Sequence, residues 1–341
     1  MEFKDIKYLA AFIIPFLVFL GLYYSGIYSF AAFIFAFVII PLVEPFFLSS
    51  EQNLNPEAKV SKRSSFFFDF LLILNLPLIA AALFILGQKI NSGSLSNLEI
   101  IGYVLSFGTF LGACGINVAH ELGHKENKFY KLLSVALLLP SFYTHFIIEH
   151  NRGHHKNVGT PKDPASAKKG DLIYSFWVRS IIGSYINAWK LEHQRIRSKK
   201  FGFIYNAMIW FTIIQIIYAL SLNYFIGTKG LLIFLLIAII SVIFLESINY
   251  IEHYGLRRQL LESGRYERVM PKHSWNSNHY FGRIVLYELT RHSDHHYLAN
   301  KKYQILDHHD DSPQLPFGYP AAMIISLIPP LWFKFIHPHL D

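Results

Sequence analysis

Histidine is the residue type best able to do chemistry in this chain. Nine of its 17 histidines fall into three tight clusters and one further position, and much of the remaining sequence is apolar. The imidazole nitrogen is the commonest neutral ligand for iron, copper and zinc in proteins. One such ion takes about four to six ligands, so nine donors suit two ions and predict a dinuclear metal site. The expected ligands are His120, His124, His150, His154, His155, His253, His292, His295 and His296.

The spacing within the first two clusters indicates how their imidazoles are arranged. His120 and His124 are four residues apart, so on a helix they share one face and converge on one site. His150 and His154 have the same separation and are expected on a common face, whereas His155 is turned about 100° away. A ligand that reaches a second metal ion, or bridges two ions, requires such a turn.

The last cluster and the single histidine follow the same logic. The three histidines of residues 292–296 stand at i, i+3 and i+4, which predicts that all three lie on one helical face. His253 is alone, but Glu246 and Asn249 precede it by seven and four residues on the same helical stripe. A polar stripe that points into an apolar bundle is expected to line a metal site or its cavity.

The remaining histidines lie outside these clusters, and a histidine near a membrane boundary is usually an interface residue. That interpretation applies to His145, His193, His308, His309, His337 and His339. His273 and His279 are weaker site candidates, because they flank the polar segment 275–278. The clusters themselves differ from a histidine-rich surface loop, since they adjoin apolar neighbours. We expect Glu44 to be a boundary carboxylate and Cys114 a packing residue.

Composition places the chain among integral membrane proteins. Its 341 residues are 52% hydrophobic and 16% charged, against about 25% charged in an ordinary soluble domain. The mean hydropathy is +0.31. Cys114 is the only cysteine, whereas an iron–sulfur cluster or a rubredoxin-type iron site needs about four thiolates. Any electrons that the protein uses must therefore come from another protein.

Apolar runs of about 20 residues predict a single all-α membrane domain, residues 1–341, with six transmembrane helices. The expected spans are near residues 8–24, 28–48, 65–87, 100–119, 202–224 and 230–250. The first run lacks the small-residue exit of a cleaved signal peptide. Residues 49–65 form the clearest polar linker, and the histidine-rich catalytic segments are residues 120–200 and 251–341.

The distribution of Lys and Arg predicts the orientation in the membrane. If the N-terminus is cytoplasmic, the loops near residues 25–27, 88–99 and 225–229 are external and hold only Lys89 and Lys229 of the 31 basic residues. Such a bias follows the positive-inside rule. The same arrangement places both termini and all four histidine sites on the cytoplasmic face. The net charge of +8 then lies beside anionic lipid, and its even spread argues against nucleic-acid binding.

Four motifs carry the histidines. They are His120-Glu-Leu-Gly-His-Lys125, Glu149-His-Asn-Arg-Gly-His-His155, Asn249-Tyr-Ile-Glu-His-Tyr-Gly255 and Arg291-His-Ser-Asp-His-His296. With them the chain resembles the bacterial membrane alkane monooxygenases, within the histidine-box superfamily of fatty acid desaturases and hydroxylases. Residues 160–167, 273–278 and 315–320 resemble further signatures of that family, in the same order. Thr290 departs from the glutamine usual in the family, which we expect to affect substrate range rather than reaction type.

The resemblance implies a non-haem di-iron enzyme of the bacterial inner membrane. Such an enzyme uses O2 to hydroxylate the terminal carbon of an n-alkane and needs no haem, flavin or iron–sulfur cluster of its own. Two electrons come from rubredoxin, which rubredoxin reductase reduces. Acidic neighbours of the clusters are candidates for orienting the imidazoles. These candidates are Glu121, Glu149, Asp163, Glu252 and Asp294.

Rubredoxins are small and acidic, so a basic cytoplasmic surface is expected to steer them to the enzyme. The candidate cations are Arg195, Arg197, Lys199, Lys200, Arg257, Arg258, Lys301 and Lys302. The substrate-binding residues and the chain-length preference do not follow from the sequence.

Other functions remain open at this point. The xylene-type monooxygenases share the histidine motifs, so aromatic methyl or fatty-acyl groups are alternative substrates, and a membrane desaturase would use a similar array to make an alkene. An intramembrane zinc protease would use His120, Glu121 and His124, but it leaves seven histidines unexplained. A metal transporter would place its ligands midway through the helices, whereas these lie at helix ends.

Overall fold

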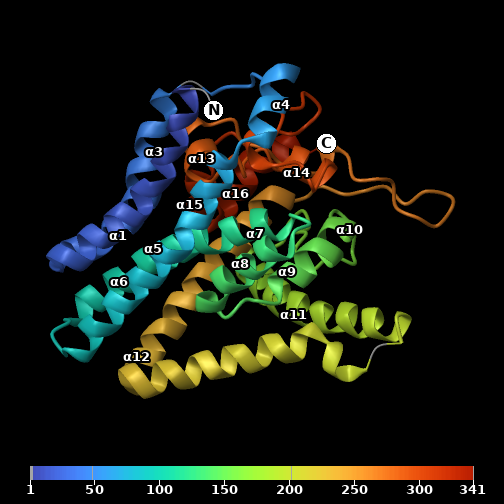
Figure 1. Ribbon diagram of the computed structural model, residues 1–341. Coiled ribbons are helices and arrows are strands. Elements are labelled where there is room, and N and C mark those ends of the chain that lie inside the picture. Colours follow the sequence, from blue (N-terminus) through green and yellow to red (C-terminus); the bar gives the residue numbers. More distant parts are fainter. Residues whose placement is uncertain (1–2, 48, 201, 341) are drawn as a thin grey trace.

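The computed structural model of the chain describes residues 3–47, 49–200 and 202–340. Within these ranges the regular structure is helical, apart from isolated β-bridges. Five helical stretches are long and apolar enough to cross a membrane, which confirms the predicted all-α membrane fold (Figure 1). They are Lys4–Tyr24, Gly26–Phe46, Phe66–Asn91, Asn97–Gly123 and Ala207–His253.

The fifth and sixth predicted spans form one continuous run. The helix α12 (Ala207–His253) has 47 residues, about twice the number that crosses a bilayer. Gly227 within it has φ 69° and ψ 173°, a conformation that glycine adopts readily because it has no Cβ. This break lies inside the predicted loop at residues 225–229 and divides α12 into two halves that match the two expected spans. One glycine, rather than a polar loop, makes the turn.

Several spans are assembled from short helical pieces. The first combines η1 (Phe3–Phe12) with α1 (Ile13–Tyr24). The second comprises η2 (Gly26–Phe30), α2 (Ala31–Ile34), π-helical η3 (Phe35–Ile39), α3 (Ile40–Val43) and η4 (Glu44–Phe46). The third is α5 (Phe66–Asn91). The fourth comprises α6 (Asn97–Phe110), π-helical η5 (Leu111–Ile116) and α7 (Asn117–Gly123), and ends beside His124.

Three turns lie together at one end of the bundle, at the lower left of Figure 1. Lys89 Nζ donates to Ser25 Oγ at 2.7 Å, and Asn91 Nδ2 donates to the carbonyl of Phe225 at 2.8 Å. These contacts join the three loops that the sequence assigns to a common side. The histidine clusters lie at the other end of the spans. Successive spans therefore run in opposite directions, as the sequence predicts. The compartment that each end faces stays a prediction.

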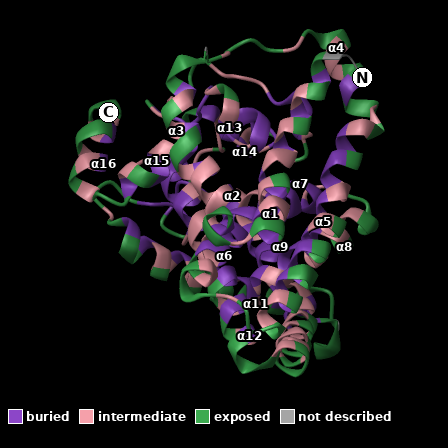
Figure 2. Cartoon of the chain, turned by 90° about the vertical axis from the view of Figure 1, so that its left-hand side faces the viewer, coloured by how far each residue is buried: buried purple, intermediate pink, exposed green. Residues whose placement is uncertain are grey.

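The clusters are carried by short elements at the end of the bundle opposite these three turns. They are α7, α9 (Phe146–Glu149), π-helical η7 (His150–His154), α10 (His155–Asn157), the end of α12 and α14 (His292–Tyr297). Further helices are α4 (Pro56–Ser64), α8 (Lys128–Leu138), α13 (Tyr280–Val285), α15 (Tyr319–Ser326) and α16 (Pro329–Ile336). Figure 2 shows the buried residues concentrated where these elements meet the spans.

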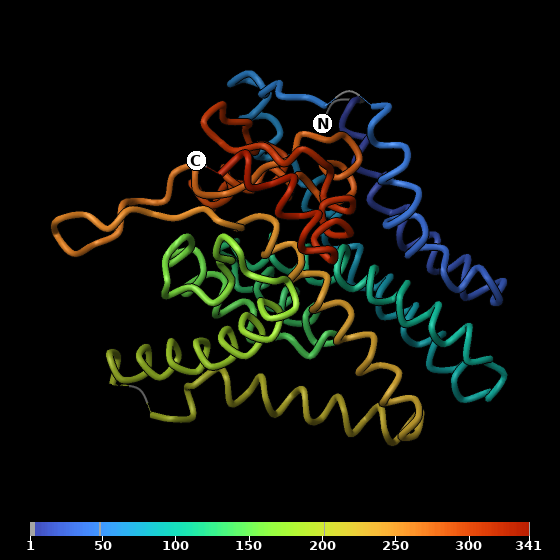
Figure 3. Tube along the Cα trace, turned by 180° about the vertical axis from the view of Figure 1, so that it is seen from behind, coloured from blue at the N-terminus to red at the C-terminus, as the bar shows by residue number. Residues whose placement is uncertain are grey.

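One long helix of the segment 120–200 has no counterpart among the apolar runs. The helix α11 (Ile173–Ser198) packs against α9 and α12, and Figure 3 shows it running beside the first half of α12. Its buried side includes Phe176 and Ala188. Hydropathy does not reveal it, because cations such as Arg179 and Lys190 interrupt the apolar residues.

Candidate metal centre

The nine clustered histidines come together in two adjoining groups, at the ends of the spans opposite the three turns. In each group the ligand atoms all lie within 4.8 Å of one another. The larger group contains His120, His124, His150, His155 and His295, and the smaller contains His154, His253, His292 and His296. No other set of three or more His, Cys, Asp or Glu side chains forms such a group in the part of the chain that the structure describes.

The imidazoles of the five-histidine group meet through their Nε2 atoms. His120 Nε2 lies 2.8 Å from His295 Nε2, which lies 3.1 Å from His155 Nε2. His155 Nε2 in turn lies 2.9 Å from His150 Nε2. The Nε2 of His124 is buried without a hydrogen-bond partner. A neutral imidazole has a single N–H, so these nitrogens cannot all satisfy one another, and the donor set fits a shared cation.

The four-histidine group likewise contains ring nitrogens that cannot all satisfy one another. His292 Nε2 lies 3.2 Å from His253 Nε2 and 3.1 Å from Glu252 Oε2. His154 Nε2 and both ring nitrogens of His296 are buried without a hydrogen-bond partner. Leaving buried polar atoms unsatisfied costs free energy, about 1–3 kcal/mol each. A metal ion in each group would satisfy them, so the residues present fit two ions.

Burial keeps the imidazoles in the form that binds metal. It lowers the pKa of His124 to about 3, and it holds the pKa of His150 and of His295 well below the ordinary value. The neighbouring histidines add to this effect, because a second positive charge beside the first is unfavourable. These rings are therefore neutral near pH 7, with a lone pair available on one nitrogen. His154 is the exception: burial lowers its pKa, but Asp163 and other nearby carboxylates more than offset this, so the net shift is upward.

The three histidines of the second cluster, residues 150–155, divide between the two groups differently from what their spacing predicts. The sequence pattern pairs His150 with His154, but the structure places His150 with His155 and sends His154 to the other group. The cause is the π-helical turn η7, in which residues five apart replace residues four apart on a common face. A π-helical turn therefore aims this cluster at both groups.

The first and last clusters show one agreement and one further difference. His120 and His124 share a group, as their spacing predicts. In α14, His292 and His296 share the smaller group, whereas His295 belongs to the larger one. Residues three apart on a helix are offset by about 60°, so a short helix between two sites can contribute to both. All three histidines lie on one face of α14, as their spacing predicts, but that face contributes to two groups.

Asp163 is the acidic candidate that orients an imidazole. Its Oδ2 lies 2.9 Å from His154 Nδ1 and accepts a hydrogen bond from Ser166 Oγ at 2.6 Å. This contact fixes the ring of His154 with Nε2 turned toward the four-histidine group. Glu252 contacts His292, another member of the four-histidine group. Ser166 was not a sequence candidate, although it lies in the signature segment 160–167.

The other three acidic candidates bind different partners. Glu149 accepts from Asn187 Nδ2 at 3.0 Å, and Glu121 accepts from a backbone N–H after α14 at 3.3 Å. Asp294 lies 2.8 Å from His309 Nε2. These contacts hold the segments that carry the clusters, rather than the imidazoles. His309 was expected to be an interface residue, so its contact with Asp294 was not predicted.

The eight remaining histidines lie outside both groups. They are His145, His193, His273, His279, His308, His309, His337 and His339. Of the two weaker candidates, His273 lies 3.0 Å from Glu267 Oε1, and His279 lies 2.9 Å from Ser277 Oγ. Cys114 is buried in the main apolar core, as expected. Glu44 is also buried and accepts from the backbone N–H of Gly282.

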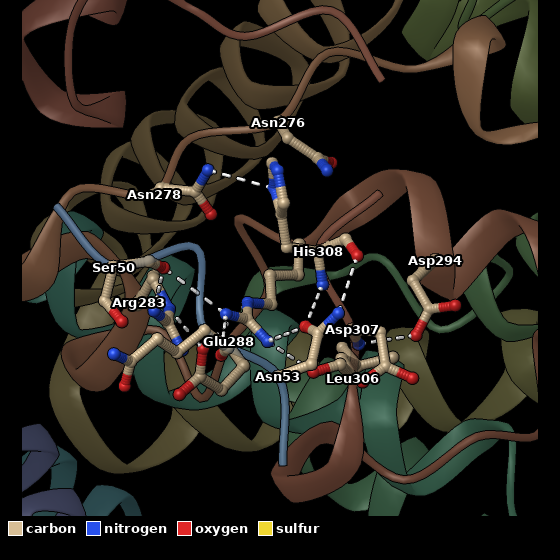
Figure 4. Close-up of polar contacts among 12 residues, drawn as sticks. Ser50, Asn53, Asn276, Asn278, Arg283, Glu288, Asp294, Leu306, Asp307 and His308 are labelled. Atoms are coloured by element: carbon tan, nitrogen blue, oxygen red, sulfur yellow. Dashed lines mark hydrogen bonds and ion pairs between the residues drawn. The ribbon is translucent and has the colours of Figure 1, made fainter. Parts of the chain in front are cut away.

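The last cluster is held by the polar linker from the other end of the chain (Figure 4). Arg283 Nη1 donates to the carbonyl of Ser50 at 2.6 Å, and Arg291 Nη2 donates to the carbonyl of Gln52 at 2.9 Å. Glu288 accepts from Arg283 Nε at 2.6 Å. Since Arg291 directly precedes the cluster, these contacts fix the start of α14.

An apolar cavity leads from the membrane spans to the histidines. His120, His150 and His292 lie in its wall, so it reaches both groups. Ile14 of the first span and Phe244 of α12 are among the many aliphatic and aromatic residues that form the rest. A cavity of this kind suits an apolar molecule that enters from the bilayer.

Comparison with known proteins agrees with this site. A family model described as fatty acid desaturase matches residues 98–324, which contain all nine histidines. An alkane 1-monooxygenase 2 of Alcanivorax borkumensis is 35% identical over 351 residues, covering 100% of this chain and 92% of that protein. An alkane 1-monooxygenase 1 of Pseudomonas aeruginosa is 38% identical over 320 residues, covering 92% and 84%. The xylene/toluene monooxygenase hydroxylase component XylM of Pseudomonas putida is 28% identical over 326 residues, covering 93% and 84%.

Proposed function

Because the chain belongs to the alkane 1-monooxygenase family, within the fatty acid desaturase superfamily, we propose that it hydroxylates the terminal carbon of n-alkanes. The reaction combines R–H, O2, two electrons and two protons to give R–OH and water. The observation that carries the proposal is the pair of buried histidine groups at the end of an apolar cavity.

The nine histidines are the proposed ligands of two iron ions, five at one ion and four at the other. When bound, the irons supply the redox chemistry that activates O2 against a strong C–H bond. The chain itself keeps most of the imidazoles neutral by burial, as at His124, His150 and His295. It holds His154 through Asp163. Its apolar cavity excludes water and binds a substrate that has no polar group to recognise.

The proposed location is the bacterial inner membrane, with both termini and the histidine groups on the cytoplasmic side. Five candidate spans support a multi-pass membrane protein. The turns opposite the histidines contain Lys89 and Lys229 as their only basic residues, which supports the orientation through the positive-inside rule.

The proposed electron donor is rubredoxin, reduced by its reductase. Among the cations considered for docking, several make contacts within the protein, including Arg195, whose Nη2 lies 2.9 Å from Glu192 Oε2. Lys301 Nζ lies 2.6 Å from Asp294 Oδ2, and Arg258 and Lys302 donate to backbone carbonyls. Reversing these charges would disturb folding as much as docking, so they are poor probes of the partner.

Product analysis tests the proposed function. Cells that express the chain with a rubredoxin and its reductase are fed octane, hexadecane and xylene, and the products are separated by gas chromatography. We expect 1-alkanols, and about two irons with negligible zinc per purified chain. An alkene product would indicate a desaturase, and oxidation of xylene alone would indicate a xylene-type enzyme. Either result would overturn the proposal.

A further inference from the structure

A hollow on the surface beside the four-histidine group is lined by basic side chains. Its cations are Lys162, Lys168, Arg179, Lys190 and Arg257. They come from the segment 160–168, from α11 and from the residues after α12. Asp163 and Ser166 lie in the same wall. Because Asp163 contacts His154, a member of the four-histidine group, this one side chain connects the hollow to that group.

The positive charge of the hollow is largely uncompensated. Arg179 pairs with Asp171 at 2.7 Å. The other four cations form no ion pair with the residues that the structure describes. Asp163 is the one carboxylate in the lining, and it is directed at His154. Like charges gathered in a concave surface raise the local potential and attract an acidic partner.

The hollow also faces away from the apolar surface of α11. Tyr174, Val178, Ile182 and Tyr185 form an exposed stripe along this helix. At 100° per residue, that stripe is centred about 130° around α11 from the side chains that line the hollow. An exposed apolar stripe beside membrane spans suits contact with the bilayer, which leaves the hollow turned toward water.

We propose that an acidic electron-carrier protein docks at this hollow, above Asp163 and His154. The inference rests on the proposed function, because monooxygenation consumes two electrons and the chain's one cysteine cannot hold an iron–sulfur centre. In each encounter the carrier is oxidised by one electron and the metal centre is reduced by one. Two encounters, with two protons, O2 and R–H, give R–OH and water. Charge complementarity favours a protein partner, since the concave basic surface is separated from the lipid-facing stripe.

The test compares two triple variants that change the net charge equally. The first, Lys162→Glu/Lys168→Glu/Lys190→Glu, reverses charge in the hollow. The control, Lys128→Glu/Lys131→Glu/Lys334→Glu, reverses exposed cations elsewhere. Each iron-loaded protein is placed in nanodiscs, and stopped-flow absorbance follows the oxidation of reduced rubredoxin at low and high salt.

We expect the second-order rate constant of the hollow variant to fall at least tenfold at low salt, with a flattened salt dependence. The control variant should stay within about twofold of wild type, because steering depends on the local potential. Equal rates in the two variants would overturn the proposal. It would also fail if the hollow variant lost binding of phosphatidylglycerol in mixed-lipid nanodiscs while rubredoxin oxidation was unchanged, because the occupant would then be a lipid headgroup.

Two further measurements distinguish a loss of docking from misfolding, and a failure of the docking proposal from a failure of the proposed function. Iron content and thermal unfolding of both triple variants should match wild type, so that a lost rate reflects docking. The oxidation of the carrier is also measured directly, independently of whether any alcohol is formed. If wild type oxidises rubredoxin through the hollow but makes no alcohol from any alkane, the docking proposal stands and the proposed function fails.

Discussion

At the scale of single residues, the two histidine groups differ in their charged neighbours. Asp163 contacts His154 and Glu252 contacts His292, and both of these histidines belong to the four-histidine group. The acidic residues near the larger group bind other partners. Neutral imidazoles cannot offset the charge of a metal ion, so nearby carboxylates decide which position holds a cation more tightly. We therefore expect the smaller group to bind a cation more tightly, for each imidazole it contributes, than the larger group.

The first prediction concerns the ligands themselves. Replacing any one of the nine grouped histidines by Ala should abolish turnover and lower bound iron, because each removes a buried nitrogen donor. Replacing His193 or His339, which lie outside both groups, should leave both quantities near wild type. Iron content by mass spectrometry and alkanol formation are the measurements. Full activity in two or more of the nine variants would contradict the assignment.

The second prediction concerns Asp163. Changing Asp163→Asn keeps its size but removes the charge behind His154, and outer contacts of this kind are worth about 10–100-fold in metal affinity. Iron per chain should fall from about two toward one under mild chelation. The control is Asp171→Asn, since Asp171 pairs with Arg179 and contacts no grouped histidine. Retention of both irons by the Asp163 variant would mean that the contact does not tune the site.

At the scale of elements, the site depends on a helical irregularity that hydropathy and spacing do not show. A four-residue interval predicts a shared face only if the helix is an α-helix, and η7 is not. Its turn is crowded. A Cβ built on Gly153 would lie 2.5 Å from Glu149 Oε1 and 2.7 Å from Asn187 Nδ2. The glycine therefore leaves room for the carboxylate–amide contact that fixes η7 against α11.

The third prediction tests this crowding. Gly153→Ala should separate Glu149 from Asn187, disturb the π-helical turn and destabilise the protein by about 1–3 kcal/mol, the usual cost of overpacking. Bound iron should fall as well, because the turn directs histidines to both groups. Thermal unfolding and iron content are the measurements. Gly202→Ala, where a Cβ meets no atom within 4 Å, is the matched control and should be neutral.

Sequence alone identified the spans and the nine grouped histidines, because apolar length and clustered donors are properties of short segments. It did not identify how the histidines divide, which depends on the local helical hydrogen bonding of η7 and on the position of α14 between two groups. It also missed α11, whose burial comes from tertiary contacts with α9 and α12. The turn at Gly227 was not predicted either, because a single glycine makes it where the sequence suggested a longer loop.

At the scale of the whole molecule, segments from both ends of the chain build one centre. Ser50 and Gln52 accept hydrogen bonds from Arg283 and Arg291, so the linker after the second span fixes the last histidine cluster. Ile14 of the first span lies in the wall of the cavity that reaches the histidines. The first two spans therefore contribute to the site although they carry none of its histidines.

The fourth prediction concerns how this molecule sits in the membrane. Cys114 is the only cysteine and is buried, so the wild type should not react with a membrane-impermeant maleimide. Ser94→Cys introduces an exposed thiol at the end opposite the histidines and should be labelled in intact spheroplasts. Lys128→Cys, exposed on the helix that follows the first cluster, should be labelled only after lysis. The opposite pattern would place the histidine groups outside the cytoplasm, where a cytoplasmic electron carrier could not reach the basic hollow.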